Sequence, residues 1–354
     1  MERGAFIIGQ DDLILVTGAT GFIGPRLVNT LIEQGYRNLR CLVRRSSEEA
    51  QLTALSGLVR KGVRFEIFTG NLLSQEDCSA AAKDAAVIFH LATSRDGKSY
   101  PEAFRNSVVT TRNLLEGTRR HDSLRRFVNV SSLVVYSNTG KPRWRRLDET
   151  CPLERHPELR GDAYCFSKVK QEEIVAEYGA RFAIPYVTLR LGYVFGPGKV
   201  SIPSRVGLDA PGVFLHLGGS NPIPLTYVDN CAEAIALAGV QPAKNGEVLN
   251  VVDDDLPSSR QFLRLYKVNM KPFKSLYLPH SLSYALCYIW ERYSAWSEGQ
   301  LLPAFNRRRW HVYWKKTRYS NDKLKAQVGW TPRVSMAEGF RRYFESCRVG
   351  EAGA

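Results

Sequence analysis

The chain has 354 residues, of which 44% are hydrophobic and 24% charged, and it carries a formal net charge of +14. This balance is ordinary for a globular protein with a sizeable core and excludes a largely disordered chain. The positive charge favours an anionic partner, which would be a phosphorylated cofactor, an acidic membrane surface or nucleic acid.

The first 35 residues predict a strand, a tight turn and a helix. The segment "DLILVTGATGFIGPRLVNTLIEQG" begins with a short apolar run at 13–16 and passes through Gly18, Gly21 and Gly24. It continues with apolar residues at helical spacing and ends at Gly35. A glycine-rich turn between a strand and a helix lets a pyrophosphate approach the free N–H groups at the helix N-terminus. This unit therefore predicts a dinucleotide-binding site.

Further strand-like runs follow, and helix-like stretches separate most of them. Strands that alternate with helices predict an α/β fold in which a doubly wound parallel sheet of the Rossmann type is covered on both faces. We expect a dinucleotide-binding domain formed by residues 1–190 and 226–255, and a smaller, discontinuous substrate-binding domain formed by 191–225 and 256–354. The strand-like runs are residues 39–45, 63–72, 85–93, 126–136, 185–198 and 246–254.

The end of the second predicted strand bears on which dinucleotide is bound. An acidic residue there bonds the ribose 2′-hydroxyl of NAD, whereas arginine accommodates the 2′-phosphate of NADP. Here the strand is followed by Arg44, Arg45 and Ser46, with no Asp or Glu. The sequence therefore favours NADP, with NAD as the alternative.

The segment "YCFSK" places Tyr164 and Lys168 four residues apart. If this segment is helical, both side chains lie on the same face. A nearby positive charge stabilises a phenolate, so the tyrosine could exchange protons at working pH. The same spacing also occurs by chance on solvated helices, and other parts of the sequence must decide between these interpretations.

The C-terminal part is rich in aromatic and basic residues. Residues 281–296 predict a helix with a broad apolar surface, which we expect to cover a core; peripheral membrane contact is the alternative. Residues 305–319 combine aromatic side chains with six Arg or Lys and no acid. That mixture can bind nucleic acid, but no nucleic-acid motif accompanies it, so we disfavour this partner.

The seven cysteines are scattered, odd in number and without a C-x-x-C pair, which argues against a disulfide framework and against a zinc site. We therefore expect reduced cysteines and no metal. No apolar run reaches the roughly 18 residues of a membrane span, and the N-terminal apolar run is too short for a secretory signal. These features lead us to expect a cytoplasmic protein.

Motifs along nearly the whole chain resemble the extended short-chain dehydrogenase/reductases, which include NAD-dependent epimerase/dehydratases, 3β-hydroxysteroid dehydrogenases and dihydroflavonol reductases. The resemblance implies a triad of Ser132, Tyr164 and Lys168, in which serine holds the substrate oxygen, tyrosine transfers a proton and lysine bonds the nicotinamide ribose. The motifs are "TGATGFIG" (17–24), "GNL" (70–72), "HLAT" (90–93), "SSLVVY" (131–136), "YCFSK" (164–168), "RLGYVFGPG" (190–198), "YVDNCAEAI" (227–235) and "VGWTPRVSMAEGF" (328–340).

The resemblance also implies a set of cofactor contacts. Two positions depart from the family pattern: Asn71 replaces the usual aspartate near the adenine, and Ser107 stands where the family often has asparagine. Dimerisation through two helices of the nucleotide domain is common in the family, although no residue here establishes it. The implied cofactor contacts are Thr17, Gly18, Gly21, Phe22, Ile23, Gly24, Asn71, Leu72, Leu91, Ala92 and Thr93, to which the strand-end argument adds Arg44 and Arg45.

Family membership leaves several reactions open. Dehydratases of this type follow the catalytic residue with an Asp-Glu pair, but Leu133 and Val134 follow Ser132 here. Nucleotide-sugar epimerases usually carry an asparagine where this chain has Tyr193, and an arginine where it has "PIPLT" (222–226). We therefore expect an oxidoreductase that interconverts a secondary alcohol and a ketone on a bulky small molecule. A nucleotide-sugar 4-epimerase, with diphosphate contacts from Arg143, Arg145 or Arg205, is the alternative, and a non-catalytic dinucleotide sensor is the third hypothesis.

Overall fold

The computed structural model describes residues 6–47, 49–93, 99–140, 146–199, 201–270, 272–298, 300–301 and 305–352. Its main feature is a parallel sheet of seven strands in the order β12-β7-β5-β4-β1-β2-β3. The predicted doubly wound Rossmann fold is thus confirmed. The strands are β1 (Leu13–Thr17), β2 (Asn38–Val43), β3 (Arg64–Thr69), β4 (Ala85–His90), β5 (Arg126–Ser132), β7 (Tyr186–Leu191) and β12 (Glu247–Val251).

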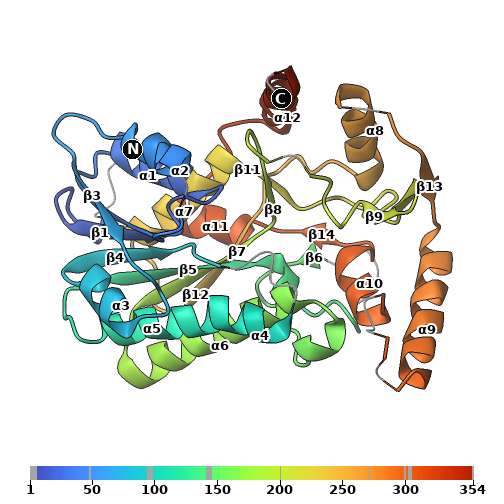
Figure 1. The fold of residues 1–354 in the computed structure, drawn as a ribbon, viewed down its shortest axis with the longest axis horizontal. Coiled ribbons are helices and arrows are strands. Elements are labelled where there is room, and N and C mark those ends of the chain that lie inside the picture. Colours follow the sequence, from blue (N-terminus) through green and yellow to red (C-terminus); the bar gives the residue numbers. More distant parts are fainter. Residues whose placement is uncertain are drawn as a thin grey trace.

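Helices cover both faces of this sheet (Figure 1). Side chains of a strand alternate between the faces, and β1 shows the result: Ile14 and Val16 enter one apolar cluster and Leu15 enters the other. α1 and α7 pack against the first face, and α3, α5 and α6 against the second. These helices are α1 (Gly24–Glu33), α3 (Gln75–Ala82), α5 (Thr110–Thr118), α6 (Ala163–Phe182) and α7 (Val228–Val240); the short α2 (Glu49–Ser56) follows β2, and α4 (Tyr100–Ala103) precedes α5.

The predicted strand run at 185–198 is two strands rather than one. β7 belongs to the central sheet, whereas β8 (Tyr193–Phe195) pairs with β11 (Leu225–Tyr227) in a separate two-stranded sheet. Gly192 lies between them, and a Cβ atom there would approach the carbonyl oxygen of Pro224 to 2.4 Å. The chain therefore leaves the central sheet at a position that only glycine fits.

Residues after β12, together with 207–216, build a second region at one end of the sheet (Figure 1). A three-stranded sheet, β13-β10-β9, lies here beside helices of the C-terminal part. Its apolar cluster contains Leu217, Cys287, Trp310 and Trp314. The elements are β9 (Gly207–Ala210), β10 (Val213–His216), α8 (Ser259–Asn269), β13 (Ser275–Tyr277), α9 (His280–Trp296), α10 (Arg307–Tyr313) and α12 (Met336–Ala352), with the pair β6 (Arg146–Leu147) and β14 (Arg318–Tyr319) between the regions. α11 (Asp322–Val328) packs instead against β12 and α7 of the first region.

The aromatic and basic segment at 305–319 is part of this interior. Trp310 and Trp314 are buried, with exposed fractions of 3% and 0%. Arg307 pairs with Glu291, and Arg308 pairs with Glu154. The rings are therefore occupied in packing rather than offered as a stacking surface for nucleotide bases. All seven cysteines are buried, and none of them forms a disulfide.

Candidate functional site

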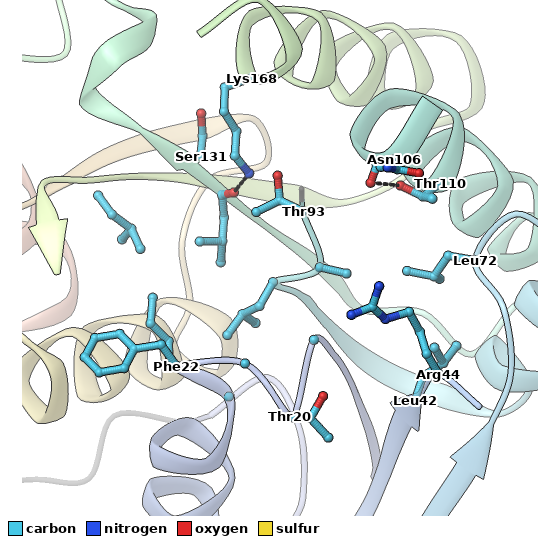
Figure 2. A pocket seen from close by; sticks show the side chains of 18 of the residues that line it. Thr20, Phe22, Leu42, Arg44, Leu72, Thr93, Asn106, Thr110, Ser131 and Lys168 are labelled. Atoms are coloured by element: carbon cyan, nitrogen blue, oxygen red, sulfur yellow. Dashed lines mark hydrogen bonds between the residues drawn. The ribbon is translucent and has the colours of Figure 1, made fainter. Parts of the chain in front are cut away.

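A cavity of about 560 Å³ opens at the carboxyl ends of the central strands (Figure 2). It lies beside β1 and β4, where the strand order reverses, and open α/β sheets bind their ligands in the crevice at this point. The residues that line it come from separate parts of the chain: Gly18, Thr20, Gly21, Phe22, Ile23, Gly24, Leu42, Val43, Arg44, Gln51, Asn71, Leu72, Leu73, Leu91, Ala92, Thr93, Asn106, Thr110, Val130, Ser131, Ser132, Tyr164, Lys168, Leu191, Gly192 and Val194.

The glycine-rich loop between β1 and α1 packs too closely for side chains. Gly18 has φ +71°, and a Cβ atom there would lie 2.8 Å from the amide nitrogen of Ala92. A Cβ atom on Gly24 would lie 2.4 Å from the carbonyl oxygens of both Gly18 and Ala19. The first turn of α1 contains no acidic residue. The loop and the start of α1 therefore form a cradle that suits the pyrophosphate of a dinucleotide.

Most of the predicted cofactor residues line this cavity, and two do not. Arg44 reaches into it from the end of β2 (Figure 2), whereas the neighbouring Arg45 is exposed outside the lining. Thr17 is fully buried beneath the loop. Asn71 lines the cavity, but its side-chain oxygen already accepts a hydrogen bond from the amide of Leu73 at 3.0 Å.

The structure brings Ser132, Tyr164 and Lys168 to the same cavity. Ser132 ends β5, and its Oγ lies 3.4 Å from both the carbonyl oxygen of Leu191 and the amide nitrogen of Val134. Tyr164 and Lys168 lie on the first turns of α6, where the tyrosine is half-buried and the lysine is 2% exposed. The Nζ of Lys168 donates to the carbonyl oxygen of Val130 at 2.7 Å, as Figure 2 shows.

The start of α6 is fixed from two directions. Asp162 caps the helix, because its carboxylate accepts a hydrogen bond from the amide of Cys165 at 3.1 Å. The same carboxylate accepts a hydrogen bond of 2.6 Å from the hydroxyl of Tyr313, at the end of α10. The C-terminal region thus contacts the residue that begins the helix carrying Tyr164.

A chain of buried hydrogen bonds leads away from Lys168. Its Nζ donates to Oε1 of Gln171 at 2.8 Å, and Nε2 of Gln171 donates to Oγ1 of Thr111 at 2.8 Å. The Thr111 hydroxyl donates to the carbonyl oxygen of Ser107 at 2.6 Å. Because its proton is used in that bond, Thr111 accepts from both Gln171 and Nε2 of His90, which lies 2.8 Å away.

This chain of bonds determines the protonation of His90. A ring that donates through Nε2 accepts through Nδ1, and Nδ1 lies 2.8 Å from the hydroxyl of Thr17. Burial, and secondly the charge of Lys168, lowers the pKa of His90 to about 3. The imidazole is therefore neutral, and the network connects the lysine to Thr17 beneath the glycine-rich loop without a second charge.

A buried ion pair holds β5, β7 and α6 together behind the cavity. The guanidinium of Arg190 pairs with the carboxylate of Glu172 at 2.6 Å, and Ser131 donates to the same carboxylate. Burial alone would lower the pKa of Arg190, but the hydrogen bonds to Glu172 hold it above its ordinary value. The ring of Tyr136 lies 4.6 Å from the Arg190 guanidinium and completes this frame.

Sequence reasoning missed several residues that line the cavity, notably Thr20, Asn106 and Thr110. Asn106 and Ser107 lie in a π-helical turn, Phe104–Val109, and such turns often occur at functional sites. Ser107 is fully buried and its hydroxyl lies 3.1 Å from that of Thr93. Asn106 does line the cavity, one position before Ser107, where the family pattern indicated an asparagine. The asparagine next to Ser107 in the sequence was the signal that could have identified it.

Fold and cavity together define a dinucleotide-binding protein of the Rossmann type. The model of the NAD dependent epimerase/dehydratase family matches residues 14–251, and the chain belongs to this family, within the extended short-chain dehydrogenase/reductases. The protein is accordingly an enzyme that uses a nicotinamide dinucleotide, as the sequence motifs predicted.

Three comparisons illustrate the relationship. A putative anthocyanidin reductase from Ginkgo biloba is 27% identical over 277 residues, which cover 72% of this chain and 80% of that protein. The 3beta-hydroxysteroid-dehydrogenase/decarboxylase isoform 1 of Arabidopsis thaliana is 24% identical over 361 residues, 94% of this chain and 79% of that protein. The crystal structure of UDP-glucuronic acid 4-epimerase from Bacillus cereus in complex with NAD superposes with a TM-score of 0.70 and 20% sequence identity, over 97% of this chain and 98% of the epimerase chain. This similarity concerns the fold alone.

Proposed function

We propose that this enzyme is an NADP-dependent oxidoreductase that interconverts a secondary alcohol and a ketone on a bulky small molecule. The observation that carries the proposal is the common cavity: Ser132, Tyr164 and Lys168 line it together with the glycine-rich loop. A proton-transfer group and a cradle for a dinucleotide therefore lie within one space. If the triad residues had only a structural role, they would not need to lie in the same cavity as the glycine-rich loop.

The three side chains handle the substrate oxygen and its proton. When bound, a nicotinamide dinucleotide would supply the hydride donor or acceptor. The Ser132 hydroxyl would donate a hydrogen bond to the substrate oxygen, and Tyr164 would take up the proton of an alcohol or return it to a ketone. Lys168, one helical turn along α6 from Tyr164, would place a positive charge near the oxygen that exchanges the proton.

NADP is proposed because of the charges that line the cavity. Arg44 and Lys168 contribute positive charge, and the described residues that form the lining include no Asp or Glu. A 2′-phosphate carries additional negative charge and suits an arginine at the end of β2. An NAD-specific site of this fold would place a carboxylate at that position.

The epimerase alternative has lost one of its candidate contacts. Arg205 is only 9% exposed, and its guanidinium donates to the carbonyl oxygen of Val312 and to the hydroxyl of Tyr319 at 2.9 Å. It therefore lies inside the protein rather than in the cavity. Arg143 and Arg145 lie outside the described residues. Cytoplasmic location, the boundaries of the two domains and homodimerisation remain predictions.

The test combines cofactor identification with a Tyr164→Phe variant. We expect the purified protein to exchange NADP(H) freely and to prefer it to NAD(H). In a screen of bulky ketones and secondary alcohols, Tyr164→Phe should retain cofactor affinity but lose at least about 100-fold in turnover, the scale of a positioned acid or base. Tightly retained NAD would instead support the epimerase, and equal turnover by both proteins would refute the role of Tyr164. If neither protein turned over any substrate while both bound the cofactor, the sensor hypothesis would be favoured.

A further inference from the structure

Helix α9 (His280–Trp296) is packed with its small side chains inward. The residues that it buries are Ser283, Cys287 and Ser294. Its large apolar side chains point to solvent, with exposed fractions of 60% for Ile289 and 75% for Trp296. The sequence predicted this helix but not this orientation, because a helix that covers a core would bury its largest apolar residues. The expectation that its broad apolar surface covers a core is therefore wrong.

The outward side chains form one continuous stripe. Positions 282, 286, 289, 290, 293 and 296 repeat at intervals of three and four residues, so they share one side of the helix. The rings of Tyr293 and Trp296 stack with centroids 5.7 Å apart. Strand β13 extends the stripe just before the helix, and α9 stands at the outer edge of the molecule in Figure 1. We call this the α9 surface; it consists of Leu276, Tyr277, Leu282, Leu286, Ile289, Trp290, Tyr293 and Trp296.

Two features of the α9 surface indicate what covers it. The surface is rich in Trp and Tyr, which favour the boundary between hydrocarbon and water because their rings are apolar and carry one polar group. Its surroundings carry a positive excess, because residues 272–316 contain seven Lys or Arg and only two Glu. Lys274 and Arg292 are exposed, whereas Lys315 is buried and Arg307 and Arg308 are held in ion pairs. Arg292 is exposed on α9 itself, and Glu291 is already paired with Arg307.

These charges argue against a second copy of the chain as the occupant. Each copy carries a net charge of +14, and apposing two basic α9 surfaces would bring like charges together. An anionic lipid surface is complementary to the same charges. An amphipathic helix can lie in the headgroup region with its apolar side buried, which does not require a spanning segment. Indeed, no helix within the described residues has the length and hydropathy to cross a bilayer.

We propose that the α9 surface binds a lipid bilayer that contains anionic headgroups, with α9 lying parallel to the membrane plane. Trp290, Tyr293 and Trp296 enter the headgroup region, and the exposed Lys274 and Arg292 contact lipid phosphates. The inference does not depend on the proposed oxidoreductase activity.

The experiment is sedimentation of the full-length protein with vesicles of phosphatidylcholine alone or of an equimolar mixture of phosphatidylcholine and phosphatidylglycerol. We expect binding to the mixed vesicles that weakens as salt is raised, because exposed charges are screened. The double variant Ile289→Ser/Trp296→Ser should bind at least about tenfold more weakly, since each side chain contributes apolar area to the membrane. The matched control is Val268→Ser on α8, which is also 75% exposed but lies outside the α9 surface; its binding should be unchanged.

Thermal unfolding and NADP(H) affinity of each variant establish that the protein is folded, since the changes are far from the cavity. The proposal is overturned if the wild-type protein does not sediment with the mixed vesicles, or if the double variant and the control bind equally well. It is also overturned if light scattering shows a wild-type dimer that the double variant loses while vesicle binding is absent. That last result would assign the surface to a second copy.

Discussion

Replacing Gln171 by Met tests whether the buried network supports the proposed site. Methionine keeps the length of the side chain but removes the acceptor for Lys168 and the donor to Thr111. Gln171 is fully buried, so water does not replace these bonds. A hydrogen bond to a charged group contributes about 1.5–3 kcal/mol, and a neutral one about 0.5–1.5 kcal/mol. The free energy of unfolding should therefore fall by about 2–4 kcal/mol.

The companion variant Gln171→Glu separates positioning from general destabilisation. It keeps an oxygen acceptor for the Lys168 ammonium, loses the donor to Thr111, and adds a negative charge that the Lys168 ammonium balances. Urea denaturation should show less than half of the loss seen with methionine. Once a substrate is identified, kcat should fall about 10- to 100-fold in Gln171→Met, with a smaller change in KM, because lysine is misplaced rather than absent; glutamate should restore most of the rate. Unchanged stability and turnover in Gln171→Met would show that the network does not hold Lys168.

Two further predictions concern single charged residues. Arg44→Ser should reduce the preference for NADP over NAD about 10- to 100-fold in affinity titrations, since it removes a charge-assisted contact to the 2′-phosphate; Arg45→Ser is the control, and an equal effect of both variants would contradict the placement of Arg44. Asp253 has its pKa raised to about 7, chiefly by burial, and its Oδ1 has no hydrogen-bond partner among the described residues. A carboxyl whose pKa is raised in the folded state contributes most to stability below about pH 4, and this contribution is lost as the pH rises to about 7. In urea denaturation at pH 8, the free energy of unfolding of Asp253→Asn should therefore exceed that of the wild type by up to about 4 kcal/mol. A constant difference from pH 4 to 8 would show that Asp253 does not titrate in this way.

The local motifs made the nucleotide-binding half of the fold predictable. The loop between β1 and α1 could be recognised because its glycines lie close together in the sequence and most of the constraints on them are local. Tyr164 and Lys168 could be paired because a helix converts a spacing of four residues into proximity. The end of the second strand likewise placed Arg44 at the cavity, although the neighbouring Arg45 could not be distinguished from it without the backbone direction.

Other parts of the site depend on contacts between distant segments and could not be predicted. Gln171 and Thr111 are 60 residues apart, and no spacing rule indicates that their side chains meet. The split between β7 and β8 follows from the approach of Gly192 to Pro224, which is a tertiary contact. The orientation of α9 was hidden for a related reason: apolar periodicity shows that a helix has an apolar side, but not whether protein covers that side.

The contact between Tyr313 and Asp162 bears on the order in which this protein matures. The two residues are 151 positions apart, so this second hydrogen bond to the cap residue of α6 forms only when synthesis has passed α10, whereas the cap bond to Cys165 is local. All seven strands of the central sheet lie before residue 252 and can pair earlier, since domains assemble from the N-terminal side during synthesis. A growing chain would thus complete its dinucleotide cradle before Tyr313 contacts the first turn of the helix that carries Tyr164. The cofactor cradle and the full set of contacts around the Tyr164 helix would therefore be completed at different times during synthesis.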